Sequence, residues 1–169
     1  MSRVVGRRPA DQLANEPKAS TTTWKTVSVH FCSIQHYNED DMLKWIDALK
    51  YTSIHAFDYG HTLGERHGYS DSLHIHFLEN GAGGGMKKEF VSMFATQYDM
   101  NEWAYTGDEC GFVSVEGSED WLKLQYHTAD SKWKFTEKWP DMTIGGVATK
   151  HCWYIPCDGF EVKACLQSQ

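Results

Sequence analysis

The sequence has no apolar run long enough to span a membrane and no apolar leader segment of the kind that opens a secreted protein. Its five cysteines include no Cys-x-x-Cys pair, and it contains no Gly-x-x-x-x-Gly-Lys-Ser/Thr motif. These absences argue against a membrane protein, a disulfide-framed secreted domain and a nucleotide-binding loop. We therefore expect an intracellular protein whose thiols are reduced; they are Cys32, Cys110, Cys152, Cys157 and Cys165.

Net positive charge is also lacking, since the formal charge of the 169 residues is −7. Proteins that track nucleic-acid phosphates usually present a basic face, so this charge weakens any case for tight nonspecific binding. It fits a metal site that contains carboxylates. The 41% hydrophobic and 14% aromatic fractions are typical of one ordered domain with a core.

The chain divides into three parts by composition. Residues 1–23 are polar and rich in basic side chains, which is typical of a flexible tail, and Arg7-Arg8 within it is weak evidence for nuclear targeting. Regular structure is expected to begin at Trp24, with a main domain over residues 24–140. Residues 141–169 are expected to extend that same domain.

The order of expected elements favours an α+β fold, with a central antiparallel sheet flanked by helices. Strands are predicted by alternating or short apolar runs, and helices by apolar residues at helical spacing after a capping residue. A loop is expected around Arg66 to Ser72. The predicted strands are 25–33, 54–59, 73–78, 102–115 (one or two, around a turn), 143–149 and 152–156, and the predicted helices are 38–50, 87–98 and one capped by Ser118.

The strongest local signal is the pair His74 and His76 in Leu73-His-Ile-His-Phe-Leu78. A strand would direct both imidazoles to one face, and Glu65 lies nine positions before the first of them. Two imidazoles and a carboxylate would form a partly open site for a divalent metal. The simpler interpretation is a half-buried strand that carries two polar residues. A zinc site begun by His151-Cys152 and Cys157 would lack a matching second pair.

Three segments in order resemble the HUH endonuclease domain of replication-initiator (Rep) proteins from circular single-stranded DNA viruses and rolling-circle plasmids. Phe31-Cys-Ser-Ile-Gln-His-Tyr-Asn-Glu-Asp40 is similar to the first motif of that family. Gly64-Glu65 with Leu73-His-Ile-His-Phe77 is similar to the second, and Asp120-Trp-Leu-Lys-Leu-Gln-Tyr-His-Thr-Ala-Asp130 is similar to the segment with the nucleophilic tyrosine. The resemblance covers residues 24–132.

The resemblance implies an endonuclease and strand transferase that nicks single-stranded origin DNA, typically in a stem-loop, and later rejoins it. Tyr126 would attack the phosphodiester and form a 5′-phosphotyrosyl intermediate. Mn²⁺ or Mg²⁺, held by Glu65, His74 and His76, would polarise the phosphoryl oxygen. The protein would act inside the cell, in the host nucleus if it is viral and its host is eukaryotic.

The third motif departs from the family pattern, because Ala129 stands where the family has a lysine. Lys123 lies three residues, about one helical turn, before Tyr126 in the expected helix and would place its ammonium group beside the phenol in compensation. Lys132 is a poorer substitute. If the resemblance is set aside, the simplest interpretation of Tyr126 is an aromatic side chain that packs on the core face of a helix.

Other residues are candidates for contacts with DNA. His36 and Tyr37 would stack on or hydrogen-bond to bases, although a polar turn before a helix is a simpler account. Lys87 and Lys88 would bind phosphates, or they are merely solvated. Two further functions stay open: a nucleic-acid-binding protein that has this fold and has lost catalysis, and an unrelated metal-binding β-rich domain.

Overall fold

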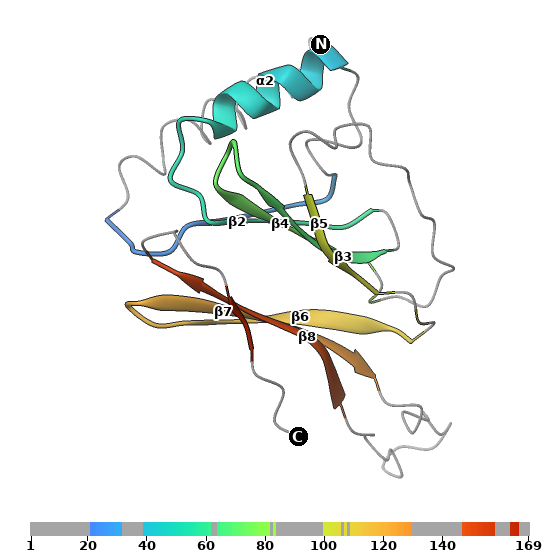
Figure 1. Ribbon diagram of the computed structural model, residues 1–169. Coiled ribbons are helices and arrows are strands. Elements are labelled where there is room, and N and C mark those ends of the chain that lie inside the picture. The colour runs from blue at the N-terminus through green and yellow to red at the C-terminus, as the bar shows by residue number, and fades with distance from the viewer. Residues whose placement is uncertain are drawn as a thin grey trace, which may run out of the picture.

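The computed structural model describes residues 21–31, 39–61, 64–81, 83, 100–105, 107, 109–129, 147–157 and 163–165. These residues form two β-sheets that pack face to face, and one helix, α2 (Glu39–Leu49), which covers the other face of the first sheet (Figure 1). The first sheet has the order β1-β2-β4-β3-β5 and the second the order β6-β7-β8-β9. The strands are β1 (Thr26–Val29), β2 (Ala56–Tyr59), β3 (Glu65–Ser70), β4 (Ile75–Asn80), β5 (Met100–Ala104), β6 (Gly111–Gly117), β7 (Trp121–Ala129), β8 (Val147–Pro156) and β9 (Lys163–Ala164).

The first sheet is mixed. β1, β2 and β4 are parallel to one another, whereas β3 pairs antiparallel with both β4 and β5. The helix α2 connects the parallel strands β1 and β2, as a crossover connection requires. The second sheet is antiparallel throughout, and β6-β7 is a hairpin. The predicted first helix and the strands of the N-terminal half are confirmed, with shifts of one to four residues at their ends.

Successive side chains along the central strands point to opposite faces of the first sheet, and an apolar cluster lies on each face. Phe57 and Phe77 face α2, where they pack with Ile46 and Leu49 of that helix. Their neighbours on the opposite face point to the second sheet, and the cluster there contains Ala56, Leu78, Leu122, Leu124 and Ile155. The first sheet is therefore buried on both faces. This arrangement explains why β4 contains a continuous run of buried residues from Ile75 to Glu79.

The expected α+β fold, with helices flanking an antiparallel sheet, is wrong. The described part of the chain is mostly β, with one helix and two stacked sheets. The helix predicted after Ser118 is the strand β7, because Leu122, Leu124 and Tyr126 recur every second residue and all three are buried. Ser118 instead closes the β6–β7 turn, where its Oγ accepts hydrogen bonds from the backbone N–H groups of Asp120 and Trp121 at 3.2 and 3.1 Å.

Two cysteines that were expected to be reduced thiols form a disulfide. Cys152 of β8 bonds to Cys165, which directly follows β9, and their Cα atoms lie 5.2 Å apart. The pairing of β8 with β9 brings them together across 13 positions of sequence, a relationship that residue spacing did not reveal. Cys110 and Cys157 are exposed free thiols.

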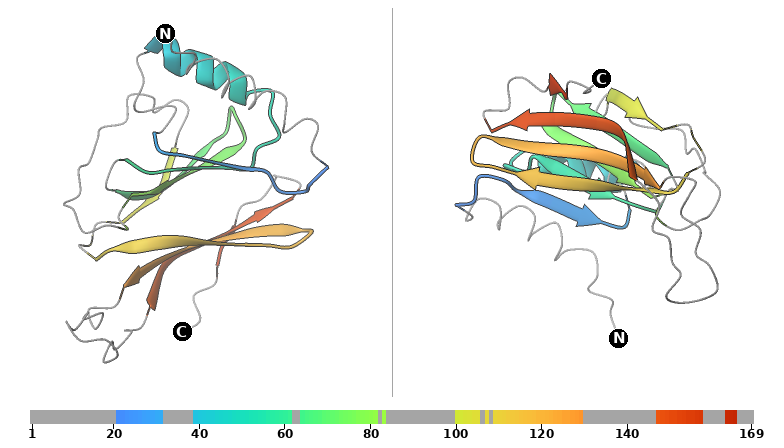
Figure 2. Two further views of the ribbon diagram at one scale, coloured as in Figure 1. Left: turned by 180° about the vertical axis from the view of Figure 1, so that it is seen from behind. Right: turned by 90° about the horizontal axis from the view of Figure 1, so that it is seen from below.

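The outer face of the second sheet is turned away from the first sheet, and Figure 2 shows it from below. None of the other described elements lies over it. In the part of the chain that the structure describes, no helix has the length and apolar character needed to cross a membrane.

Candidate functional site

Three histidines meet in the space between the two sheets and form a hydrogen-bonded chain, which we call the histidine cluster. His76 of β4 contacts His67 of β3, with Nδ1 and Nε2 2.8 Å apart. His67 in turn contacts His151 of β8, with Nδ1 and Nε2 2.9 Å apart. The chain therefore links the first sheet to the second through side chains that are far apart in the sequence.

Aromatic rings enclose the histidine cluster. Trp103 stacks on His151 with ring centroids 4.5 Å apart and an interplanar angle of 11°. Tyr69 lies against His76, with centroids 4.6 Å apart, and Trp153 lies edge-on to His67 at 5.3 Å. His67 and His76 are consequently almost fully buried. Removal from water disfavours the charged form of each ring.

Burial, followed by repulsion from His76 and His151, lowers the pKa of His67 to about 2. Burial also lowers the pKa of His76 to about 3 and that of His151 to about 4. The three rings are therefore neutral near pH 7. Because a neutral imidazole has one donor and one acceptor nitrogen, the central His67 satisfies both neighbours in either of two proton arrangements.

The metal site predicted from the sequence is not assembled as expected. His74 lies in the β3–β4 turn rather than on β4, where it is exposed, has a φ of 56°, and its Nδ1 lies 3.2 Å from Tyr69 Oη. Glu65 is buried on β3 opposite Asn80, whereas His76 is opposite Tyr69. The two pairs are four positions apart along the strands, which is about 13 Å at the usual rise per residue. No group of three or more His, Cys, Asp or Glu among the described residues is placed to hold a metal ion.

The predicted nucleophile and its lysine lie on opposite faces of β7. Tyr126 points between the sheets, where it is buried against Trp103 and Tyr105. Lys123 points to the outer face, where its Nζ lies 3.7 Å from Glu116 Oε2. Three positions along a strand reverse the direction of a side chain, whereas three positions along a helix nearly preserve it. The assistance that Lys123 was expected to lend Tyr126 depended on a helix.

Tyr126 borders a hollow of about 10 Å³, which is room for about one water molecule, together with His67 and His151. Its Oη is buried and makes no hydrogen bond to the described residues. The structure thus brings Tyr126 and His76, two residues singled out in the sequence, to the same histidine cluster.

A larger opening lies in the same inter-sheet space, and we call it the Asp58 cleft. Its volume is about 130 Å³. It shares Leu78 and Val113 with the hollow beside Tyr126, so the two adjoin. Asp58 supplies its charge, and the residues that line it are Thr26, Ser28, Ala56, Asp58, Leu78, Asn80, Val113 and Val115.

Sequence reasoning missed two of these site residues, His67 and Asp58, and it considered a third, His151, only as part of a zinc site with Cys152 and Cys157. His67 lies in the segment expected to be a loop, which is wrong for residues 66–70 because they belong to β3. The alternation of Glu65, His67 and Tyr69 was the available signal. The expected DNA-contacting residues His36, Tyr37, Lys87 and Lys88, the predicted helix 87–98 and Lys132 lie outside the described residues.

Comparison with known proteins finds similarity in fold alone. No family model matches the chain, and no curated protein matches its sequence. A solved structure of PhoD superimposes with a TM-score of 0.62 at 10% sequence identity, over 97% of this chain and 35% of PhoD. The chain thus spans about a third of the length of that structure.

The resemblance to HUH endonucleases is therefore wrong. The fold is similar to part of PhoD, and the segment likened to the tyrosine motif is a strand with its tyrosine between two sheets. Cleavage of origin DNA, binding of single-stranded DNA, and use of Mn²⁺ or Mg²⁺ lose that support and stay untested predictions.

Proposed function

We propose that this chain binds a small organic cation, a primary alkylammonium group, in the Asp58 cleft. One observation carries the proposal. Asp58 Oδ1 is buried at the cleft and has no hydrogen-bond partner among the described residues. A buried carboxylate oxygen without a donor is costly, and an ammonium group in the cleft would remove that cost.

The electrostatics of the Asp58 cleft favour a cation. Among the described residues that line the cleft, Asp58 is the one ionisable side chain, and none of them is a lysine, arginine or histidine that would offset its charge. Burial raises the pKa of Asp58, while the hydroxyl of Ser28, which donates to Oδ2 at 3.3 Å, acts in the opposite direction. The net charge of −7 on the chain adds a weaker general attraction for cations.

The other residues that line the cleft provide hydrogen-bond acceptors for an ammonium group and an apolar surface for an alkyl chain. An ammonium group has three N–H donors, and the acceptors beside Asp58 are the hydroxyl groups of Thr26 and Ser28 and the amide oxygen of Asn80. Ala56, Leu78, Val113 and Val115 form an apolar wall for a short alkyl stem. An apolar wall with a few polar groups is the usual composition of a ligand site.

The position of the cleft in the fold gives further support. Ser28, Asp58 and Asn80 lie in the carboxyl-terminal halves of β1, β2 and β4, which are parallel. The register pairs Ser28 with Asp58 and Asp58 with Leu78, which places these polar groups on the face of the first sheet that meets the second sheet. The second sheet contributes β6 as the facing wall through Val113 and Val115.

Titration with n-butylammonium, followed by ¹H–¹⁵N correlation spectra, tests the proposal. We expect saturable shifts of backbone amides in β1, β2, β4 and β6. Uncharged n-butanol and anionic butyrate should shift them far less. Mg²⁺ at the same concentration tests the hard cation expected from the sequence, and displacement of the amine by Mg²⁺ would assign the cleft to a metal ion instead.

Asp58→Asn keeps the shape of the side chain and removes its charge. We expect the Kd for n-butylammonium to rise about 10-fold to 100-fold, the range for loss of a charge-assisted hydrogen bond. Asp71→Asn, in the exposed β3–β4 turn, is the matched control and should bind as the wild type does. Equal affinity of wild type and Asp58→Asn, or equal binding of amine and alcohol, would overturn the proposal.

A further inference from the structure

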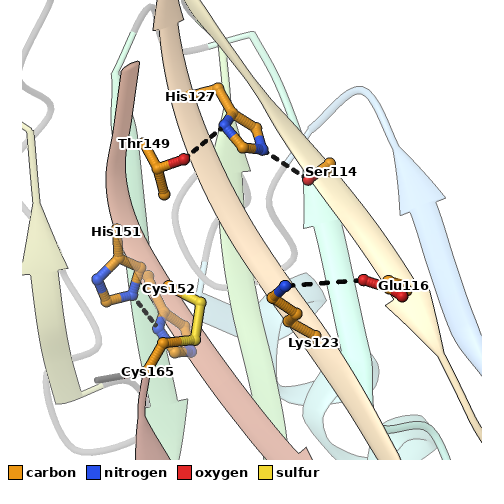
Figure 3. Close-up of a disulfide and its surroundings, with 9 residues drawn as sticks. Ser114, Glu116, Lys123, His127, Thr149, His151, Cys152 and Cys165 are labelled. Carbon is orange, nitrogen blue, oxygen red and sulfur yellow. Dashed lines mark hydrogen bonds and ion pairs between the residues drawn. A yellow bond between two sulfur atoms is a disulfide. The ribbon is translucent and has the colours of Figure 1, made fainter. Parts of the chain in front are cut away.

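The outer face of the second sheet contains a second hydrogen-bonded group, separate from the inter-sheet space. Ser114 of β6, His127 of β7 and Thr149 of β8 lie side by side on three adjacent strands (Figure 3). Ser114 Oγ lies 2.7 Å from His127 Nε2. His127 Nδ1 lies 3.1 Å from Thr149 Oγ1 on the other side of the ring. We call these three residues the Ser–His–Thr group.

The two contacts of His127 are compatible with one assignment of protons that suits catalysis. If Nδ1 carries the hydrogen, it donates to Thr149 Oγ1, and the lone pair of Nε2 accepts the hydroxyl hydrogen of Ser114. This is the arrangement by which a histidine activates a serine while a third residue holds its ring. Burial, followed by the nearby positive charge of Lys123, lowers the pKa of His127, which keeps it in the neutral form that accepts a proton.

The surroundings leave room for a substrate. Thr149 is exposed and His127 is partly exposed, so the group opens to solvent. Phe112 packs beside His127, with ring centroids 5.1 Å apart, and 45% of its surface is exposed, which offers an apolar contact. Gln125 is directly opposite Ser114 in the β6–β7 register. Directly paired residues have side chains on the same face, so the Gln125 amide is a candidate donor beside Ser114.

We propose that Ser114 is a nucleophile for acyl transfer from small carboxylic esters, with His127 as its general base and Thr149 as a positioning residue. In the first step the Ser114 Oγ–carbon bond forms and the hydroxyl proton passes to His127 Nε2. The ester carbon–oxygen bond then breaks, and the leaving alkoxide takes that proton to depart as an alcohol. Water then attacks the acyl-serine while His127 Nε2 takes one of its protons. The bond between the acyl carbon and Ser114 Oγ breaks, His127 returns the proton to Oγ, and the carboxylic acid departs. The Gln125 amide would donate to the carbonyl oxygen as it gains charge.

This proposal is independent of the Asp58 cleft, which opens on the other side of the second sheet. It rests on the two contacts of His127, whereas the amine site rests on Asp58. Either proposal would survive failure of the other.

Labelling with an alkyl fluorophosphonate tests the nucleophile. An activated serine displaces fluoride and keeps the phosphonyl group, which intact-mass and peptide mass spectrometry detect. We expect one label per chain, located on Ser114. Ser114→Ala should abolish it, and Ser53→Ala, which removes an exposed serine before β2, should label as the wild type does. Label on another residue, or none where a known serine hydrolase labels fully, would overturn the proposal.

Hydrolysis of p-nitrophenyl acetate separates the roles of the other two residues. His127→Asn should lower the rate of acyl-enzyme formation at least 100-fold, the usual contribution of a general base. Thr149→Val should lower it about 10-fold, and Thr149→Ser should restore it, because only the hydroxyl positions the ring. Equal rates for Thr149→Val and wild type would remove the positioning role. A Ser114→Ala variant as active as wild type would show that hydrolysis occurs elsewhere.

Discussion

His67 Nε2 and His76 Nδ1 lie 2.8 Å apart in the buried space between the two sheets, and His151 extends this contact to the second sheet. A polar chain in this position is stable because each ring nitrogen involved has a partner. Because the rings are buried, protonation of any of them would place an unpaired charge between the sheets and destabilise the fold. Acid should therefore weaken the contact between the two layers of the fold.

The free energy of unfolding should fall steeply as the pH drops below about 6.5, where an unfolded histidine begins to bind a proton. Folded His67 and His76 stay neutral down to about pH 2 and 3, so the unfolded state binds more protons throughout the interval. Each of these rings then contributes a loss of up to about 1.4 kcal/mol per pH unit. Urea unfolding at a series of pH values measures the slope. His67→Asn should flatten it, and parallel slopes for variant and wild type would contradict this account.

Tyr126→Phe should raise stability by about 1 kcal/mol, because the buried Oη has no partner among the described residues and its removal ends a desolvation cost. Most changes from tyrosine to phenylalanine at hydrogen-bonded positions have the opposite sign. Tyr69→Phe provides the comparison, since the Tyr69 hydroxyl contacts His74 Nδ1 at 3.2 Å. Chemical denaturation measures both variants. A loss of stability in Tyr126→Phe would indicate a partner for Oη.

Gly111→Ala should destabilise the fold by about 2 kcal/mol, within the range for overpacking. A Cβ at position 111 would overlap Tyr126 Oη and the backbone oxygen of His127. Gly117→Ala is the matched control on the same strand, because its Cβ would meet the nearest side-chain atoms at 3.5 Å, an ordinary contact. Thermal and urea unfolding of the two variants should therefore differ clearly, and equal stabilities would refute the close packing of Tyr126 on Gly111.

Loss of the Cys152–Cys165 disulfide should lower the free energy of unfolding by about 3 kcal/mol, as expected for closure of a short loop. The double variant Cys152→Ser with Cys165→Ser removes it without leaving an odd thiol. Reductant should lower the stability of the wild type and leave that of the double variant unchanged. A wild type that does not respond to reductant under unfolding conditions would mean that the two cysteines are unpaired in solution.

The residue pattern within a segment predicted its secondary structure correctly where that structure does not depend on a distant segment. The residue type at position 38, the acids after it and the apolar stripe of Trp45, Ile46 and Leu49 predicted α2, and the stripe faces the core as expected. The segment after Ser118 misled because its apolar residues were counted toward a helix. Leu122, Leu124 and Tyr126 match a strand better, and pairing with β6 and β8 supplies the backbone hydrogen bonds that decide the matter.

The sequence by itself determined which short segments bury one face, and it marked His76 as a polar side chain in an apolar segment. Tyr126 was singled out only through a resemblance that proved wrong. The tertiary structure alone decided which of these residues meet. His67 and His151 lie 84 positions apart, and Ser114, His127 and Thr149 come from three strands. Such contacts depend on strand order and register, which arise from pairing between distant segments. Periodicity within one segment contains no information about its partners.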